Sequence, residues 1–185
     1  TGTAQDLKNS IDNIQIGGRN LITSDSISTY NATIDKTRYA REGIITLTKD
    51  TNYGGISIPA RLLKPSKVYV ISYKYKKING TLVSFGGHTD PSWSDNKTYV
   101  DGVYKGAHNS STSGFVVDDT NIHEVICYIT TPSAITESHL FYIQPNRGYK
   151  GLVTVEVYDL KLEEGNKATD WTPAPEDKQD NLQTI

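Results

Sequence analysis

Short segments in which apolar and polar residues alternate are the feature that most limits what this chain can fold into. The clearest is KVYVISYKYKKI at 67–78, where Tyr69, Ile71, Tyr73 and Tyr75 fall on one face of an extended strand. Between residues 19 and 165 no stretch of ten residues has good helical periodicity, apart from a short turn expected at 59–64. The body of the chain is therefore predicted to be all-β.

About ten segments have this strand character, and turn residues separate them. They are RNLIT (19–23), SISTYNATI (26–34), GIITLTK (43–49), GGISIP (54–59), 67–78, TLVSFGG (81–87), a short strand around 99–103, HEVICYITT (123–131), SHLFYIQP (138–145) and GLVTVEVYDLKLEEG (151–165). Asn79-Gly80 is a hairpin signal, so 81–87 is expected to pair back onto 67–78. The apolar parity changes near Tyr158-Asp159, which predicts a β-bulge. Many short strands with regular turns predict a β-sandwich.

The two ends of the chain differ from this body. Leu7, Ile11 and Ile14 have helical spacing, and Gly17-Gly18 would end that helix. The predicted division is a helical lead-in at 1–18, the sandwich at 19–172 and a proline- and acid-rich exit linker at 173–185. Because the chain contains no Met and begins with TGT, we expect it to be a piece of a longer polypeptide.

Composition argues against several classes of partner. With 19 basic and 21 acidic residues the net charge is -2, which gives no general attraction to nucleic acid or to an anionic membrane. No apolar run approaches the roughly 20 residues that span a bilayer, so membrane insertion is not expected. Cys127 is the single cysteine, which excludes an internal disulfide and predicts a buried thiol in a protein made in a reducing cytoplasm.

Two motifs bracket the predicted sandwich. IGGRNLI at 16–22 and LKLEEGNKATDWTPAPED at 160–177 resemble the opening and closing motifs of a domain found in tail and baseplate proteins of phages of Gram-positive bacteria, most of all accessory baseplate proteins of lactococcal siphophages. Such domains are similar to the jelly-roll carbohydrate-binding modules of families four and nine. The resemblance implies a non-catalytic virion protein, made in the host cytoplasm, whose partners are other baseplate proteins and host cell-wall polysaccharide.

The closing motif also has a physical interpretation. Leu160 and Leu162 are expected in the core of the last strand, and Gly165-Asn166 supplies a turn. Trp171 is expected to fold back and seal the edge of the sandwich rather than to bind ligand. No cofactor is required; the related modules imply a structural calcium ion at Asp159, although no Asp-x-Asp loop supports it.

Saccharide recognition needs flat apolar rings and planar polar groups, and these guide the choice of candidate ligand-binding residues. Trp93 leads, because it lies in the polar context DPSWSDN within the loop-like segment 86–114. The alternative is that Trp93 anchors its own loop. The further candidates are Tyr99, Tyr104, His88, Asp90 and His108 from the same segment, Tyr53 and Tyr149 in the turns NYGG and NRGYKG, and Arg147 as a hydrogen-bonding fork.

Enzymatic function receives little support from the sequence. Nucleophile-elbow, phosphate-loop, zinc-protease and dinucleotide motifs do not occur, and the four histidines lack zinc-ligand spacing. A glycosidase needs two carboxylates that face each other, and no spacing in the sequence shows such a pair. Two alternatives to saccharide binding stay open: a structural spacer or docking module of the baseplate and, more remotely, a polysaccharide depolymerase.

Overall fold

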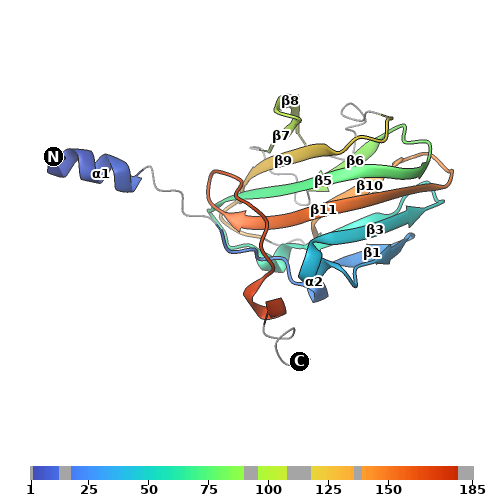
Figure 1. Ribbon diagram of the computed structural model, residues 1–185, viewed down its shortest axis with the longest axis horizontal. Helices are drawn as coiled ribbons and strands as arrows, with labels where there is room; N and C mark the ends of the chain where they lie inside the picture. Colours follow the sequence, from blue (N-terminus) through green and yellow to red (C-terminus); the bar gives the residue numbers. More distant parts are fainter. Residues whose placement is uncertain (1, 13–17, 90–95, 108–117, 136–138, 179–185) are drawn as a thin grey trace.

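A computed structural model of the chain describes residues 2–12, 18–89, 96–107, 118–135 and 139–178. Two antiparallel sheets pack face to face in it, with strand orders β1-β4-β10-β6 and β2-β3-β11-β5-β9-β7-β8 (Figure 1). The fold is the predicted all-β sandwich of the kind found in carbohydrate-binding modules. No helix in the described part of the chain is long and apolar enough to cross a membrane.

The elements have the following bounds. The four-stranded sheet contains β1 (Ser28–Tyr30), β4 (Gly55–Pro59), β10 (His139–Pro145) and β6 (Phe85–Thr89). The seven-stranded sheet contains β2 (Thr33–Asp35), β3 (Ile44–Lys49), β11 (Val153–Glu164), β5 (Val68–Gly80), β9 (His123–Thr130), β7 (Lys97–Val100) and β8 (Val103–Gly106). Helix α1 spans Ala4–Asp12, α2 spans Tyr39–Glu42, and residues 175–178 are also helical. The 3-10 turns are η1 (Ser24–Ser26) and η2 (Ala60–Leu62).

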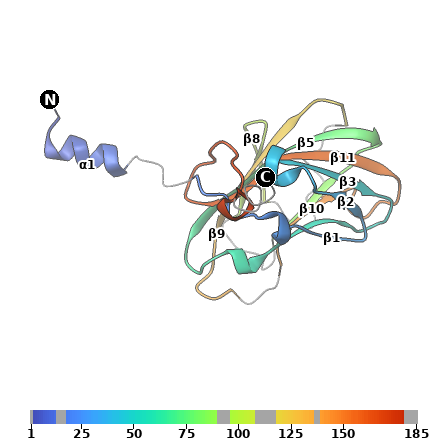
Figure 2. The same ribbon diagram turned by 60° about the horizontal axis from the view of Figure 1, so that its bottom comes forward.

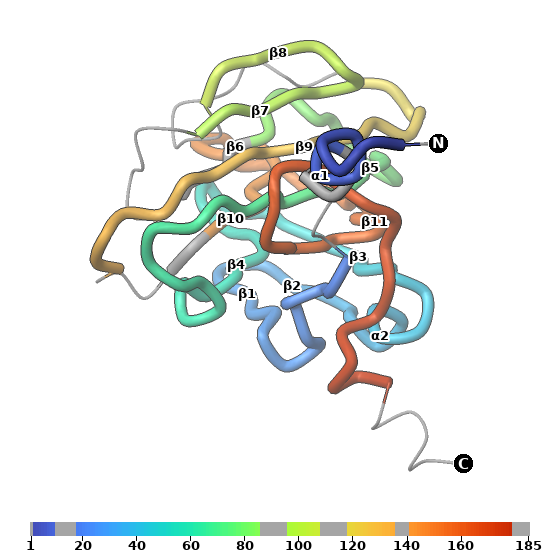
Figure 3. Tube along the Cα trace, turned by 90° about the vertical axis from the view of Figure 1, so that its left-hand side faces the viewer, coloured from blue at the N-terminus to red at the C-terminus, as the bar shows by residue number. Residues whose placement is uncertain are grey.

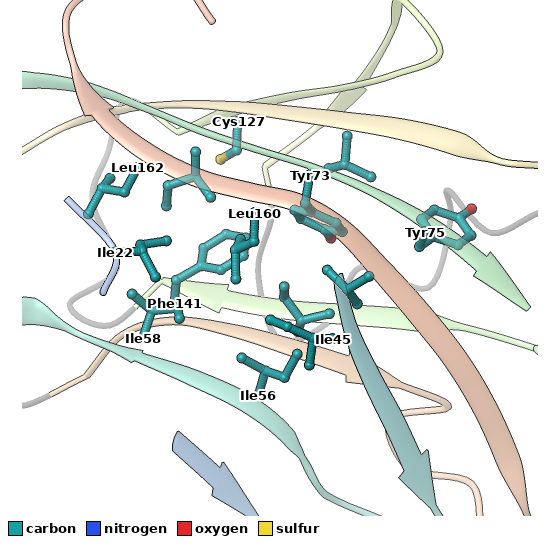
Figure 4. Close-up of a cluster of buried hydrophobic side chains, with 14 of the residues drawn as sticks. Ile22, Ile45, Ile56, Ile58, Tyr73, Tyr75, Cys127, Phe141, Leu160 and Leu162 are labelled. Atoms are coloured by element: carbon teal, nitrogen blue, oxygen red, sulfur yellow. The ribbon is translucent and has the colours of Figure 1, made fainter. Parts of the chain in front are cut away.

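One hydrophobic core lies between the sheets. Alternate residues of the central strand β5 point into it, and Tyr69, Ile71, Tyr73 and Tyr75 are almost fully buried, as their spacing predicts. Figure 4 shows residues of the two sheets meeting, with Tyr73 and Cys127 from one sheet and Phe141 from the other. Full burial of a large apolar side chain contributes about 1.5–3 kcal/mol, so this core holds the sandwich together.

The predicted bulge in the last strand is confirmed. β11 pairs with β5 as Tyr158 opposite Lys74 and then as Lys161 opposite Ser72, so β11 carries one extra residue. Asp159 occupies that position with a φ of 56°, and its N–H donates to the Gly43 carbonyl at 2.8 Å. Because the bulge resets the alternation, the valines before it and the leucines after it all point into the core.

The predicted hairpin between 67–78 and 81–87 is wrong. Both edges of β5 are occupied by β11 and β9, and β6 pairs instead with β10 of the other sheet. The Asn146 side chain directs this crossing: its Oδ1 accepts from the N–H of Val83 at 2.8 Å, and its Nδ2 donates to the Thr81 carbonyl at 2.7 Å. A hairpin dipeptide therefore fails here because burial of Leu82 and Phe85 draws the chain across the core.

Three other local predictions need correction. The segment 26–34, predicted as one strand, is divided into β1 of one sheet and β2 of the other. Residues 19–23 form no strand, although Ile22 is buried; Leu21 makes one backbone hydrogen bond, to Leu162. The segment 86–114 is less loop-like than its composition indicates, because β6, β7 and β8 overlap it. The turn expected at 59–64 is confirmed as η2.

The entry and exit of the sandwich lie side by side. Arg19 pairs with Glu176 at 2.5 Å, and the Asp177 carboxylate accepts from the Ser24 N–H at 3.0 Å. α1 precedes this junction and stands clear of the sheets in Figure 2, with Leu7 64% exposed. The division of the chain at residues 18 and 172 stays a prediction.

Candidate functional site

A groove of about 440 Å³ lies on the outer face of the seven-stranded sheet. The segment after β11 doubles back over this face (Figures 1 and 3). Its residues Ala168, Thr169, Asp170 and Trp171 form one wall of the groove. Ligand-binding clefts commonly have volumes of roughly 300–1,000 Å³, so the groove is large enough for a small ligand. It is lined by Ser72, Tyr73, Lys74, Glu124, Ile126, Asp159, Ala168, Thr169, Asp170 and Trp171.

Adjacent strands form the floor of the groove. Ser72 of β5 lies opposite Ile126 of β9, and Lys74 lies opposite Glu124. Since Tyr73 and Val125 point into the core, their sequence neighbours point outward. The floor therefore combines one apolar side chain with hydroxyl, ammonium and carboxylate groups.

Trp171 forms the apolar part of the wall. Its ring packs edge-on against Tyr39 of α2, with centroids 5.9 Å apart and planes at 74°. The Tyr39 hydroxyl is itself fixed, because it donates to the Leu160 carbonyl at 2.6 Å and accepts from Asn20 at 2.9 Å. The expected role of Trp171 in sealing the sandwich agrees with this packing, but the indole also faces the groove.

A buried ion pair holds the rest of the wall. The Lys161 ammonium donates to the Thr169 hydroxyl and to the Asp170 carbonyl, both at 2.7 Å. The Glu163 carboxylate lies 3.6 Å from the same ammonium and accepts from the hydroxyl of Thr169 at 2.6 Å. Both charged residues are fully buried, so the wall is fixed to β11 by hydrogen bonds that water does not replace.

Three tyrosines continue the floor toward the edge of the sheet. Tyr99 of β7 lies opposite Ile126, with Tyr104 of β8 at 5.5 Å and Tyr128 of β9 at 5.8 Å between ring centroids. Tyr104 is 57% exposed. The groove and these rings, which we call the tyrosine cluster (Tyr99, Tyr104 and Tyr128), form one continuous face with polar and flat apolar parts.

A histidine clamp fixes the hairpin that carries Tyr99 and Tyr104. His123 Nδ1 lies 2.7 Å from an oxygen of Asp101 in the β7–β8 turn, and Nε2 lies 2.7 Å from one of Asp119. Burial disfavours the imidazolium, but the two carboxylates outweigh it and raise the pKa of His123. Hydrogen bonding to His123 likewise lowers the pKa of Asp119.

The predicted ligand residues fall into three groups. Tyr99 and Tyr104 lie in the tyrosine cluster next to the groove. Trp93, Asp90 and His108 lie outside the described residues, and of His88 only the backbone, in β6, is described. The third group, Tyr53, Arg147 and Tyr149, comes together elsewhere.

We call this third group the corner (Tyr53, Arg147 and Tyr149). The Arg147 guanidinium lies 5.3 Å from the centroid of the Tyr53 ring, and both tyrosines are more than half exposed. Lys49 supports the corner from below by donating to the carbonyls of Pro145 at 2.6 Å and Asn146 at 2.7 Å. Burial, with nearby Arg147, lowers the pKa of Lys49 to about 8. Because Lys49 pairs with Val153 at the start of β11 and the groove wall follows its end, the corner and the groove are separate.

Several groove residues were not among the sequence candidates. Lys74 belongs to the short basic run KYKK at 74–77, for which a solvated strand face is the simplest interpretation, and Glu124 falls in no motif. Asp170 lies in the closing motif at 160–177, whose residues were expected to close the fold and not to bind ligand. The one sequence signal that could have identified Lys74 and Glu124 as surface residues of the sheet is their outward position in strongly alternating strands.

The predicted calcium position also lies at this groove. The nearest ionic partner of Asp159 is the Lys74 ammonium, 3.7 Å from its carboxylate. Among the described residues no group of three or more His, Cys, Asp or Glu could hold a metal ion. An ammonium beside a single carboxylate does not fit the oxygen cage that calcium requires, and calcium binding stays a prediction.

Comparison with solved structures supports the fold class. The chain is similar to the CBM22-1 xylan-binding domain of Xyn10C from Paenibacillus barcinonensis, with a TM-score of 0.50, 12% identity, and coverage of 83% of this chain and 95% of that domain. The Stig cyclase Fisc from Fischerella sp. TAU gives a TM-score of 0.44 at 11% identity, with coverage of 77% of this chain and 86% of that one. A second cyclase from Fischerella sp. TAU gives a TM-score of 0.45 at 11% identity, with coverage of 83% of this chain and 90% of that one. No protein-family model matches the sequence, and no curated protein is significantly similar to it. The fold thus defines a β-sandwich of the carbohydrate-binding-module type.

Proposed function

We propose that this chain is a non-catalytic saccharide-binding module and that the groove with the tyrosine cluster is its binding face. The observation that carries the proposal is the continuity of this face: Ile126 both lines the groove and lies opposite Tyr99. Sugar rings present apolar C–H faces to flat rings and hydroxyls to polar groups. The groove offers Trp171 for the first purpose, and Ser72, Lys74 and its carboxylates for the second.

The structural neighbour supports this proposal. That protein is a xylan-binding domain, and its fold is the one this chain shares most fully among the matches described above. Since identity is 12%, the likeness is one of architecture. Neither the identity of the sugar nor the position of the site is carried over from that domain.

We further propose that the module belongs to a phage tail baseplate and mediates adsorption to polysaccharide of a Gram-positive host. The opening and closing motifs support this origin, and the adjacent entry and exit points, joined through Arg19 and Glu176, suit a module carried on a larger assembly. Weak binding by each module would be amplified by multivalent display. Its partners would then be host wall polysaccharide and other baseplate proteins.

A matched pair of tyrosine variants tests the proposal. Tyr104→Ala and Tyr53→Ala remove side chains of similar exposure, 57% and 53%, from the tyrosine cluster and from the corner. We expect Tyr104→Ala to weaken binding to Gram-positive cells and purified wall polysaccharide roughly fivefold, and Tyr53→Ala to leave it within about twofold, because aromatic contacts contribute about 0.5–1.5 kcal/mol. If the unaltered 185-residue chain binds neither cells nor polysaccharide, it is a spacer or docking module instead.

Catalysis is the second candidate, because Glu124, Asp159 and Asp170 all line the groove. Two carboxylates across a cleft are the requirement of a glycosidase. Incubation of the chain with host polysaccharide, followed by measurement of reducing ends, distinguishes the two functions. The binding proposal predicts no release; release that Glu124→Gln abolishes would establish a depolymerase.

A further inference from the structure

The charges of the groove indicate which saccharides it accepts. Its lining residues include three carboxylates, from Glu124, Asp159 and Asp170, and one ammonium, from Lys74. We propose that the groove discriminates against saccharides that bear phosphate or carboxylate groups and accepts uncharged saccharides in preference to them. This inference rests on the proposed function and names the ligand class of the same site.

The single lining ammonium is already opposed by carboxylates. Lys74 Nζ lies 3.7 Å from Asp159, and Glu124 is its direct cross-strand neighbour on β9. An anionic ligand approaching Lys74 would therefore have to displace Asp159 and would meet Glu124 at short range. Both steps weaken binding, because like charges at a partly enclosed surface repel more strongly than in bulk water.

The second ammonium near the groove lies behind its wall. Lys161 is fully buried, and its hydrogen bonds go to Thr169 and to the Asp170 carbonyl, with Glu163 as its ionic partner. Its charge is thus balanced inside the protein. The Asp170 side chain, in contrast, is exposed at the wall.

Hydrogen-bonding capacity leads to the same ligand class. Ionised carboxylates only accept hydrogen bonds, and sugar hydroxyls donate them. Phosphodiester and uronate oxygens only accept, so they offer these carboxylates nothing in return. Between a neutral and an anionic saccharide, the groove is consequently better matched to the neutral one.

The test titrates the isotope-labelled chain with two sets of oligomers, and amide shifts of Ile126 and Trp171 report on the groove. The first set is one saccharide in two charge states: hexagalacturonate and its methyl ester. The second set contains neutral glucan, xylan and N-acetylglucosamine oligomers. We expect at least one neutral ligand to bind with a Kd about tenfold or more below that of hexagalacturonate at low ionic strength, where screening is weak. The double variant Glu124→Gln, Asp170→Asn should reduce that difference to about threefold or less, because it removes two of the three lining carboxylates.

The outcomes separate the two proposals. If hexagalacturonate binds the unaltered groove as tightly as the neutral ligands, or if the double variant leaves the difference unchanged, the charge-selection proposal is overturned while saccharide binding stands. If neither these oligomers nor fragments of Gram-positive wall polysaccharide shift Ile126 or Trp171, the proposed function itself fails, and the charge proposal fails with it.

Discussion

The groove and the corner are built from similar parts, yet they differ in shape. Exposed tyrosine rings lie beside the groove, in the tyrosine cluster, and in the corner itself. Each site rests on a buried lysine that donates to backbone carbonyls: Lys161 beneath the groove wall and Lys49 beneath the corner. Each also has a glycine at positive φ, Gly43 at 70° and Gly148 at 82°. A Cβ at Gly43 would lie 2.8 Å from Asp159 Oδ1, whereas one at Gly148 would meet nothing within 4 Å.

The difference shows what turns an aromatic surface into a groove. At the groove, the chain after β11 returns across the sheet and encloses polar side chains beside the rings. At the corner, the Tyr53 ring lies under Arg147 and faces outward. Exposed tyrosines alone therefore do not define a binding site. The proposed saccharide site depends on the wall that the chain after β11 forms.

The largest expected effect comes from removing Lys161, and removal of Lys49 is the matched change in the corner. Lys161→Met leaves Glu163 charged and buried without its ionic partner, and breaking one side of such a pair costs about 3–5 kcal/mol. Lys49→Met leaves carbonyls without a donor and should cost about 1–3 kcal/mol. Urea unfolding measures both losses.

The saccharide affinities of the same two lysine variants distinguish the groove wall from the corner. Lys161→Met should weaken binding under conditions in which the protein is still folded, because its wall is no longer fixed. Lys49→Met should leave the affinity unchanged. Equal affinities for the two variants would contradict a role for the wall.

The two glycines give the next largest effect. Gly43→Ala places a methyl group against Asp159 and the Trp171 ring and adds left-handed backbone strain, so we expect a loss of about 2–3 kcal/mol and weaker saccharide binding. Gly148→Ala adds only the backbone strain, about 1–2 kcal/mol, with binding intact. Thermal unfolding and saccharide titration of both variants test the contrast, and a Gly43→Ala protein with normal binding would show that the wall adjusts freely.

The smallest expected effect is the pH dependence of the stability that the His123 clamp contributes near the tyrosine cluster. His123 has a raised pKa, so its clamp stabilises the native state fully below the unfolded pKa of about 6.5 and loses this contribution as pH rises through the native value. The lowered pKa values of Asp101 and Asp119 act on the acid side, where their contribution is lost as pH falls below the ordinary value of 3.8.

Comparison with His123→Gln isolates this contribution. The stability difference between the unaltered protein and the variant should be larger at about pH 6 than at about pH 9. Tyr53→Ala supplies the matched control in the corner, since it leaves both the clamp and Lys49 in place. A stability difference for His123→Gln that does not change over this range would exclude the charged clamp.

The sequence predicts most of the sandwich because burial imposes strict alternation on its central strands. β3, β5, β9 and β11 have strong patterns, and even the bulge at Asp159 is visible as a change of parity. The path of 81–87 was not predicted, because the turn signal at Asn79-Gly80 is local and the Asn146 contacts that divert the chain come from 62–65 residues away.

The candidate site is less accessible to such reasoning. Tyr99 and Tyr104 were selected for their residue type, and the structure places them beside a groove. Glu124, Lys74 and Asp170 lie far apart in sequence and meet only because β5 lies next to β9 and the chain after β11 returns over the sheet. Strand order depends on long-range pairing, which no local pattern encodes.

The most direct test of the account is a titration of the isotope-labelled chain with fragments of Gram-positive wall polysaccharide, followed residue by residue by NMR. We predict amide shifts at Ser72, Ile126 and Trp171 in the groove and at Tyr99 and Tyr104 beside it, with the amides of Tyr53 and Gly148 unchanged. Shifts confined to the corner, or no shifts at any concentration, would contradict the claim that this face binds saccharide.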